Sequence, residues 1–146
     1  MNTTHLFREI VRNAGDAMIF ADTDGRIELW NQGAEDIFGH TEEEALGESL
    51  DIIIPKQLRD RHWDGYYTAM EQGSTTYERG DRLSVPAVRK DGERLSVAFT
   101  VTLIDDSDGK LAGIAAILRD VTDQWNAQQK RKERIQELED RIDENR

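Results

Sequence analysis

The residue with the clearest potential for chemistry is His62, which lies in a stretch predicted to form one helix, Pro55–Gly73. Proline is favoured at the start of a helix and glycine at its end, so these two residues mark its limits. The apolar side chains recur at every fourth position and share one face with the histidine: Leu58, His62, Tyr66 and Met70. Neutral imidazole is the commonest metal ligand among side chains. The functional question is therefore what His62 meets on the buried side, and a packed histidine bonded to the backbone is one answer.

Other polar clusters in the chain lack the spacing that a metal site or a catalytic site requires. His5 and His40 fall in a terminal helix and in a turn, where we expect both at the surface. The aspartates within 22–24 and 105–108 belong to turn sequences without the spacing and terminal glutamate of an EF-hand. The chain has no cysteine, no phosphate-binding glycine loop and no Ser-His-Asp arrangement. We therefore do not expect an enzyme.

The composition indicates one acidic domain with a short appendage. The chain has 146 residues and a formal net charge of −11, which disfavours binding to nucleic acid or to anionic lipid. A salt-tolerant source would produce the same kind of surface. No apolar run reaches the roughly 18 residues of a spanning helix, and the N-terminus lacks a signal-peptide core. We expect no nucleic-acid or membrane partner and a cytoplasmic location.

The first half of the chain alternates helix signals with one hairpin. The expected elements are a helix at 3–13, strands at 17–21 and 26–30, short helices at 32–39 and 41–47, and an apolar turn at 49–55. Thr3 or Thr4 is the expected N-cap of the first helix, and Asn31 that of the second. Thr41 and Glu44 have the spacing of a capping box, which marks the start of the next helix.

After Gly73 the apolar pattern changes from helical spacing to alternation, which indicates strands. The expected strands are 75–89, 94–104 and 111–118. Pro86 donates no ladder hydrogen bond, so we expect its strand at a sheet edge or a bulge. With the hairpin, these strands give an α+β domain whose antiparallel sheet has about five strands, with the middle helices over one face.

The last 24 residues, 123–146, contain no glycine or proline and are predicted to form a helix with Thr122 as its N-cap. Ile135, Leu138 and Ile142 have the a-d-a spacing of a coiled-coil seam. Such a polar helix is marginal alone, so a parallel partner helix would stabilise it. A solvated tail that frays is the alternative.

Four motifs in order resemble the PAS domain, a sensory module of bacterial signalling proteins. They are AMIFADTDGRIELWN at 17–31, IFGHTEEEALGESL at 37–50, VRKDGERL at 88–95 and ILRDVT at 117–122. The resemblance implies a PAS fold: a five-stranded antiparallel sheet with short helices over one face. It also implies three parts, namely an N-terminal cap helix at 1–15, the PAS domain at 16–122 and a C-terminal signalling or coiled-coil helix at 123–146.

Within this family, the chain is most similar to the haem-binding oxygen sensors. The flavin and coumaryl light sensors of the family need a cysteine, which this chain lacks. The haem sensors carry an axial histidine on the long helix, and His62 follows Pro55 at the same distance as in those sensors. The D-G-Y of one haem branch recurs at 64–66, one residue late, because Trp63 is interposed. Aligned on that motif, Trp63 would take the ligand position, but the Pro55 register keeps His62 on the apolar face.

The resemblance also implies which residues surround the haem. GDRL at 80–83 matches the strand whose arginine contacts bound oxygen or a propionate, which makes Arg82 the distal arginine. Tyr77 aligns with an apolar distal position and is the alternative hydrogen-bond donor. The candidate cofactor contacts are His62, Arg82, Tyr77, Phe99, Val101, Leu118 and Tyr66, with His62 as the metal ligand. The alternatives are core or sheet packing for Tyr66 and Tyr77, and an exposed ion pair for Arg82.

These features imply a sensory domain that binds haem b, responds to O2, CO, NO or redox state, and signals through its C-terminal helix. The alternative is a PAS module that binds another small ligand, such as a fatty acid or other metabolite, or none, and that serves dimerisation and signal relay. We expect a homodimer through the N-terminal and C-terminal helices. We also expect an effector outside this chain, such as a kinase, a cyclase or a regulator.

Overall fold

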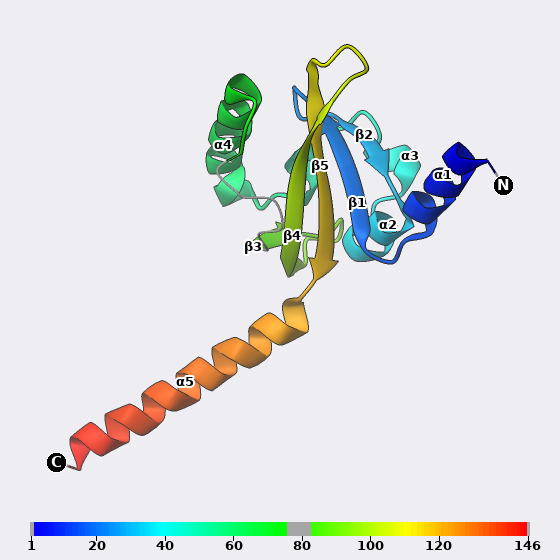
Figure 1. The fold of residues 1–146 in the computed structure, drawn as a ribbon. Coiled ribbons are helices and arrows are strands. Elements are labelled where there is room, and N and C mark those ends of the chain that lie inside the picture. The colour runs from blue at the N-terminus through cyan, green and yellow to red at the C-terminus, as the bar shows by residue number, and fades with distance from the viewer. Residues whose placement is uncertain (1, 76–82, 146) are drawn as a thin grey trace.

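The computed structural model of the protein describes residues 2–75 and 83–145 and is built around one antiparallel sheet (Figure 1). The strands are β1 (Ala17–Asp22), β2 (Ile27–Trp30), β3 (Leu83–Val88), β4 (Arg94–Asp105) and β5 (Leu111–Asp120). Their order across the sheet is β2-β1-β5-β4-β3, which places β5 in the middle and β3 at an edge. The five-stranded sheet and the edge position of Pro86 confirm the predictions. Of the strand expected at 75–89, the described residues form a strand only from Leu83 to Val88.

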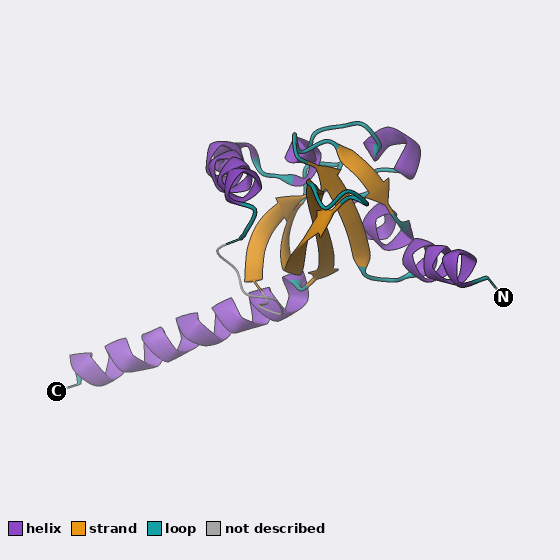
Figure 2. Ribbon diagram, turned by 45° about the horizontal axis from the view of Figure 1, so that its top comes forward, coloured by secondary structure: helices purple, strands orange, loops and turns teal. Residues whose placement is uncertain are grey.

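The helices are α1 (Thr3–Asn13), α2 (Gln32–Phe38), α3 (Glu42–Ala45), 3₁₀ turns at Leu50–Ile53 and Lys56–Leu58, α4 (Arg59–Gln72) and α5 (Thr122–Glu144). α4 stands apart from α1, and α5 extends away from the sheet (Figures 1 and 2). Neither α1 nor α5 has a buried residue. In the described ranges, no helix is long and apolar enough to cross a membrane.

Local capping signals predict several of these boundaries correctly. The Asn31 side chain accepts a hydrogen bond from the Ala34 N–H at 3.0 Å, which caps α2. Thr41 and Glu44 form the expected capping box at α3. Gly73 ends α4 in the left-handed region, with φ of +68°, as expected of a glycine in that position.

Other boundaries differ from the predictions because a competing partner takes the group. Asn2, rather than Thr3 or Thr4, caps α1. Thr122 does not cap α5: its hydroxyl oxygen accepts a hydrogen bond from the Ser96 N–H at 3.1 Å and so links the helix to β4. His40 is only partly exposed, because its ring packs edge-on against Trp30 at 6.2 Å. The expected surface position of His40 is therefore wrong.

The core is formed by residues of all five strands and of the short helices, and its largest fully buried side chains are Trp30, Phe38, Ile27 and Val97. Burying a side chain such as Phe38 stabilises the fold by roughly 1.5–3 kcal/mol. Asn31 ties the surrounding segments together. Its side chain accepts from the Met18 N–H at 2.8 Å and donates to the Val11 and Asp16 carbonyls at 2.8 and 3.1 Å.

Candidate ligand-binding site

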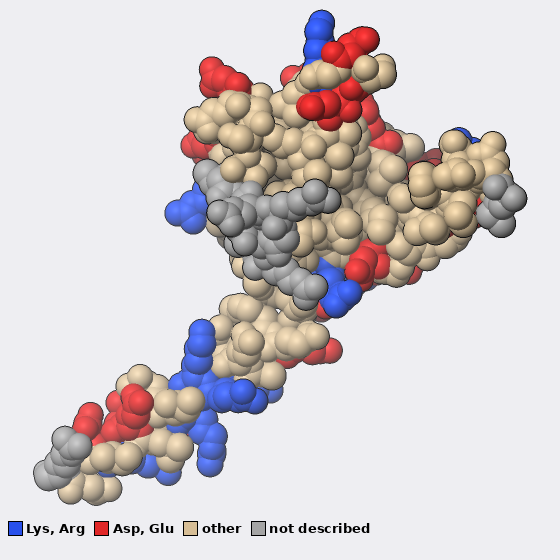
Figure 3. Space-filling view, viewed as in Figure 1, with Lys and Arg blue, Asp and Glu red and all other residues tan. Residues whose placement is uncertain are grey.

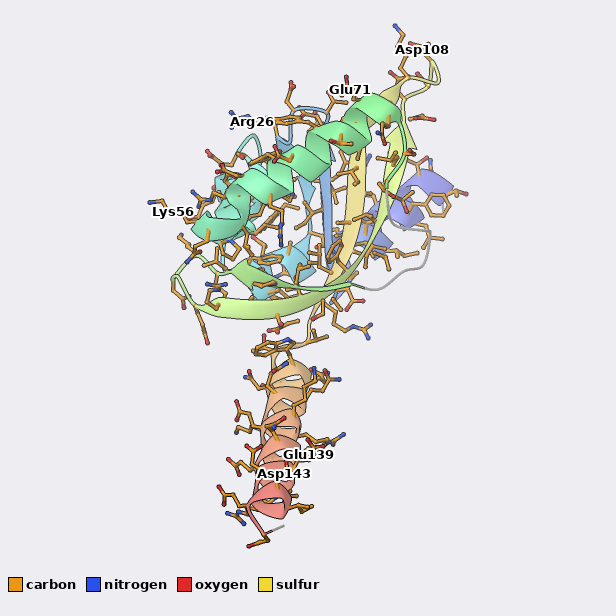
Figure 4. All side chains as sticks on the ribbon, turned by 90° about the vertical axis from the view of Figure 1, so that its left-hand side faces the viewer. Arg26, Lys56, Glu71, Asp108, Glu139 and Asp143 are labelled. Atoms are coloured by element: carbon orange, nitrogen blue, oxygen red, sulfur yellow. The ribbon has the colours of Figure 1, made fainter. Side chains whose placement is uncertain are left out.

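A cavity of about 760 Å³ lies between part of α4 and side chains of β3, β4 and β5. Figure 4 shows α4 in front of the sheet. Its apolar lining consists mainly of Ile54, Leu58, Val85, Phe99, Val101 and Ile114. Small-molecule and cofactor sites in proteins are mostly apolar clefts of about 300–1,000 Å³. The cavity therefore has the size and the lining of such a site.

His62 projects from α4 into the lining of this cavity. The side chain is half-buried, and its Nδ1 is buried with no hydrogen-bond partner among residues 2–75 and 83–145. Burial lowers the pKa of His62 below its ordinary value, although the Asp51 carboxylate acts to raise it. The imidazole is therefore neutral at physiological pH, which is the form that ligates a metal ion.

Trp63 and Tyr66 fix α4 against the rest of the domain. The Trp63 indole N–H donates to the Asp51 carboxylate at 2.7 Å, and Trp63 does not line the cavity. The buried Tyr66 hydroxyl donates to the Asp22 carbonyl at 2.5 Å, and burial raises the Tyr66 pKa. Tyr66 thus presents only its ring to the cavity. Of the two residues that compete for the ligand position, His62 is the one that faces the cavity.

Gly65 lies one helical turn beyond His62 and also lines the cavity. A Cβ atom built on Gly65 would meet no atom of the described residues within 4 Å, and its φ is not positive. The backbone conformation therefore does not require glycine here, and the cavity extends to the helix itself. Gly65 is not among the predicted site residues, although glycine inside a helix costs about 1 kcal/mol relative to alanine and so calls for a reason.

The other predicted contact residues divide into three groups. Phe99 and Val101 line the cavity. Leu118 does not line it: opposite Ala17 of β1, Leu118 is buried in the core, while Ile114 on the same face of β5 borders the cavity. Tyr77 and Arg82 lie outside the described residues.

The donor set around the cavity limits the kind of metal site that it can form. In residues 2–75 and 83–145, no group of three or more His, Asp or Glu side chains could hold a metal ion. Among the described residues that line the cavity, a bare ion would thus find only His62 and Asp64 as strong ligands, fewer than a metal site normally needs. Haem differs because its macrocycle supplies the in-plane ligands, and one axial imidazole is sufficient. The lone neutral histidine, the apolar walls and the bare backbone at Gly65 fit such a group.

The comparisons with known proteins agree with this architecture. The family model described as PAS fold matches residues 11–125. The sensor protein FixL of Bradyrhizobium diazoefficiens is 31% identical over 139 residues, which cover 95% of this chain and 26% of FixL. The oxygen sensor protein DosP of Escherichia coli is 24% identical over 111 residues, which cover 76% of this chain and 14% of DosP. The chain thus spans about a quarter or less of the length of these two relatives.

Among solved structures, the PAS domain of a Colwellia psychrerythraea protein superposes with a TM-score of 0.71 at 20% identity. The match covers 84% of this chain and 99% of that domain. At this identity the superposition concerns the fold alone. The family match and the fold together establish that the chain belongs to the PAS family of sensory domains.

Proposed function

We propose that this PAS domain binds haem b in the α4 cavity, with His62 as the protein ligand of the iron. The observation that carries the proposal is the half-buried, neutral imidazole of His62 at the wall of a large, mainly apolar cavity. When bound, haem supplies an iron centre that responds to O2, CO, NO or redox state. His62 orients the group, and the apolar walls exclude water from it.

Two further features support this ligand over a smaller one. The cavity reaches the α4 backbone at Gly65, which suits a broad, flat molecule lying close to the helix. The exposed Arg61 and Asp64 also border the cavity, so a ligand with polar edges could place those edges toward solvent. The relative DosP is named as an oxygen sensor, which agrees with a gas as the signal.

The test is a hemin titration of the purified chain and of two histidine variants. We expect a Soret band that saturates with one hemin per chain, that is lost in His62→Ala and that persists in His5→Ala, since His5 is exposed on α1. A Soret band unchanged in His62→Ala would refute the proposal. If no variant binds hemin, mass spectrometry of ligands extracted from the chain tests the alternative, in which the apolar cavity holds a fatty acid or other metabolite.

We further infer that the output leaves through α5. The backbone of β4 contacts the start of this helix twice: Val121 N–H donates to the Ser96 carbonyl at 2.9 Å, and Ser96 N–H donates to Thr122. β4 also carries Phe99 and Val101 of the cavity wall. A ligand that moves β4 would therefore shift the first turn of α5, and the effector, such as a kinase, a cyclase or a regulator, would respond.

The exposed seam of α5 supports pairing with a second copy of the chain. Ile135, Leu138 and Ile142 are 51%, 45% and 58% exposed, although a lone helix gains nothing from apolar residues there. In this heptad register, Arg134 is a g position and Glu139 an e position, so parallel helices place opposite charges together. An antiparallel pair would bring Arg134 against Arg141 instead. Basic side chains gather at the middle of α5, as Figure 3 shows.

The N-terminal helix offers a second surface for the same dimer. On α1, Leu6, Phe7 and Ile10 are 41%, 63% and 55% exposed and lie at helical spacing on one face. We propose that the cap helix at 1–15 and the signalling helix at 123–146 flank the PAS domain at 16–122 and contribute to dimerisation. Removal of either helix should weaken self-association in sedimentation experiments. A truncated chain that still dimerises fully would refute the role of that helix.

A further inference from the structure

Trp63 joins α4 to two distant segments of the chain. Its indole N–H donates to Asp51, which lies in the 3₁₀ turn before α4, at 2.7 Å. The far edge of the same ring lies directly on Gly25, in the β1–β2 turn: a Cβ there would be 2.1 Å from Cη2. The Trp63 ring also stacks on the Tyr67 ring, with the two ring centroids 5.5 Å apart. The indole is thus held at both ends by groups outside its helix.

The Trp63 ring also contacts the ring of His62, the proposed protein ligand of the iron. The rings of His62 and Trp63 meet edge to face with centroids 4.7 Å apart. Neighbouring residues of a helix point about 100° apart, so a helix rotation that released Trp63 would turn His62 away from the cavity. We infer that Gly25, Asp51 and Trp63 form a latch that, beside the hydrogen bond from Tyr66 to Asp22, fixes the rotation of α4 and thereby positions His62 toward the cavity.

Two separate features of the structure favour glycine at position 25. Its φ is +81°, which glycine adopts without strain, and its missing side chain makes room for the indole. The chain contains a second turn with the first property only. Residues 106–110 (DSDGK) repeat 22–26 (DTDGR), and Gly109 has the same φ of +81°, but no described residue has an atom within 4 Å of a Cβ built there.

The hydrogen bonds of the two turns match as well. Gly25 N–H donates to the Asp22 carbonyl at 3.0 Å, and Gly109 N–H donates to the Asp106 carbonyl at 3.0 Å. In each turn the first aspartate side chain accepts from the backbone two residues and four residues later. Gly109→Ala therefore reproduces the backbone strain of Gly25→Ala without the collision with Trp63.

The test compares these two variants in the intact chain of 146 residues, without added cofactor. Diethyl pyrocarbonate labels neutral imidazole, and peptide mass spectrometry after labelling above the ordinary histidine pKa separates His62 from the exposed His5. We expect several-fold faster labelling of His62 in Gly25→Ala than in Gly109→Ala, with His5 unchanged in both. Equal His62 labelling rates in two folded variants would overturn the latch.

Asp51 provides a second arm that leaves the turn intact. Asp51→Ala removes the acceptor of the Trp63 N–H, whereas Asp51→Asn keeps an oxygen that can accept it. We expect faster His62 labelling in Asp51→Ala and the parent rate in Asp51→Asn. A faster rate in both variants would assign the effect to the charge of Asp51 rather than to the latch, and would overturn it.

A third arm uses hemin and rests on the proposed function. Groups that orient a metal ligand typically change metal affinity by about 10–100-fold when they are removed. We expect a loss of this size in Gly25→Ala and in Asp51→Ala, and none in Gly109→Ala or Asp51→Asn. If the parent chain binds no hemin, the proposed function fails while the labelling arms still decide on the latch.

Discussion

Substitution at Gly65 should raise the stability of the chain and weaken ligand binding at the same time. Gly65 lies in α4 without a positive φ, and a Cβ there would meet no atom within 4 Å in the part of the chain that the structure describes. Alanine should therefore fit the ligand-free protein without strain. Leucine should occupy the cavity itself, one turn from His62, where the proposed ligand would lie.

The two effects can be estimated separately. Replacing glycine by alanine inside a helix contributes about 0.8–1.0 kcal/mol, because the unfolded chain loses freedom and the helix gains no clash. For a chain of this length that corresponds to an increase of roughly 2–4 °C in Tm. Ligand affinity should fall at least tenfold in Gly65→Leu, which corresponds to about 1.4 kcal/mol of lost binding free energy. Gly65→Ala should lie between the parent and the leucine variant.

The assay pairs urea unfolding of the ligand-free chain with hemin titration of the same preparations. Glu71→Leu is the matched control, because Glu71 is exposed on the same helix and does not line the cavity. It should bind hemin like the parent chain, and its position at the end of α4 is visible in Figure 4.

Two results would contradict this reasoning. Hemin affinity in Gly65→Leu equal to that of the parent would mean that the ligand does not approach this face of α4, and the role of His62 would fall with it. A loss of stability in ligand-free Gly65→Ala would mean that glycine serves the backbone after all. Neither result is expected from the open space around Gly65.

Three other predictions follow from single interactions. Because burial lowers the His62 pKa, the folded chain binds fewer protons than the unfolded chain, so the free energy of unfolding should fall as the pH drops below about 6.5. Urea unfolding across that pH should show a smaller pH dependence in His62→Gln. Tyr66→Phe removes the buried hydrogen bond to the Asp22 carbonyl and should destabilise the fold by about 1–2 kcal/mol. Because the Tyr66 pKa is raised in the folded chain, the parent should also lose stability above about pH 10, and Tyr66→Phe should lose less. Arg134→Glu and Glu139→Arg should each weaken self-association roughly tenfold in sedimentation equilibrium, and the two substitutions combined should restore it. Stronger self-association in Arg134→Glu would instead indicate an antiparallel pair.

The sequence predicts those parts of the fold whose cause is local. The hairpin turn at 22–25, the cap at Asn31 and the capping box at Thr41 all depend on residues within a few positions of one another, and all are present. The alternation of apolar and polar residues likewise predicts β4, because strand periodicity is also a local property. The sheet class follows from the order of these elements.

Features that depend on contacts between distant segments could not be predicted in the same way. Thr122 has the residue type of an N-cap, but Ser96, 26 positions earlier, uses its hydroxyl instead. Leu118 and Ile114 share one face of β5, and only the pairing of that strand with β1 and β4 decides which of them borders the cavity. The contact between Trp63 and Gly25 spans 38 positions and carries no periodic signal at all.

Two residues of the site, Gly65 and His62, lower the stability of the folded chain. Gly65 lowers helix propensity, and the buried Nδ1 of His62 has given up hydrogen bonds to water without gaining a partner. Alanine at position 65 and an apolar residue at position 62 would both favour the fold. Residues that oppose stability locally are concentrated at functional sites. Since Gly65 and His62 border the same cavity, one turn apart, a ligand that covers the bare backbone and binds the imidazole through its other nitrogen accounts for these two residue types at these positions, whereas a purely structural role for α4 does not.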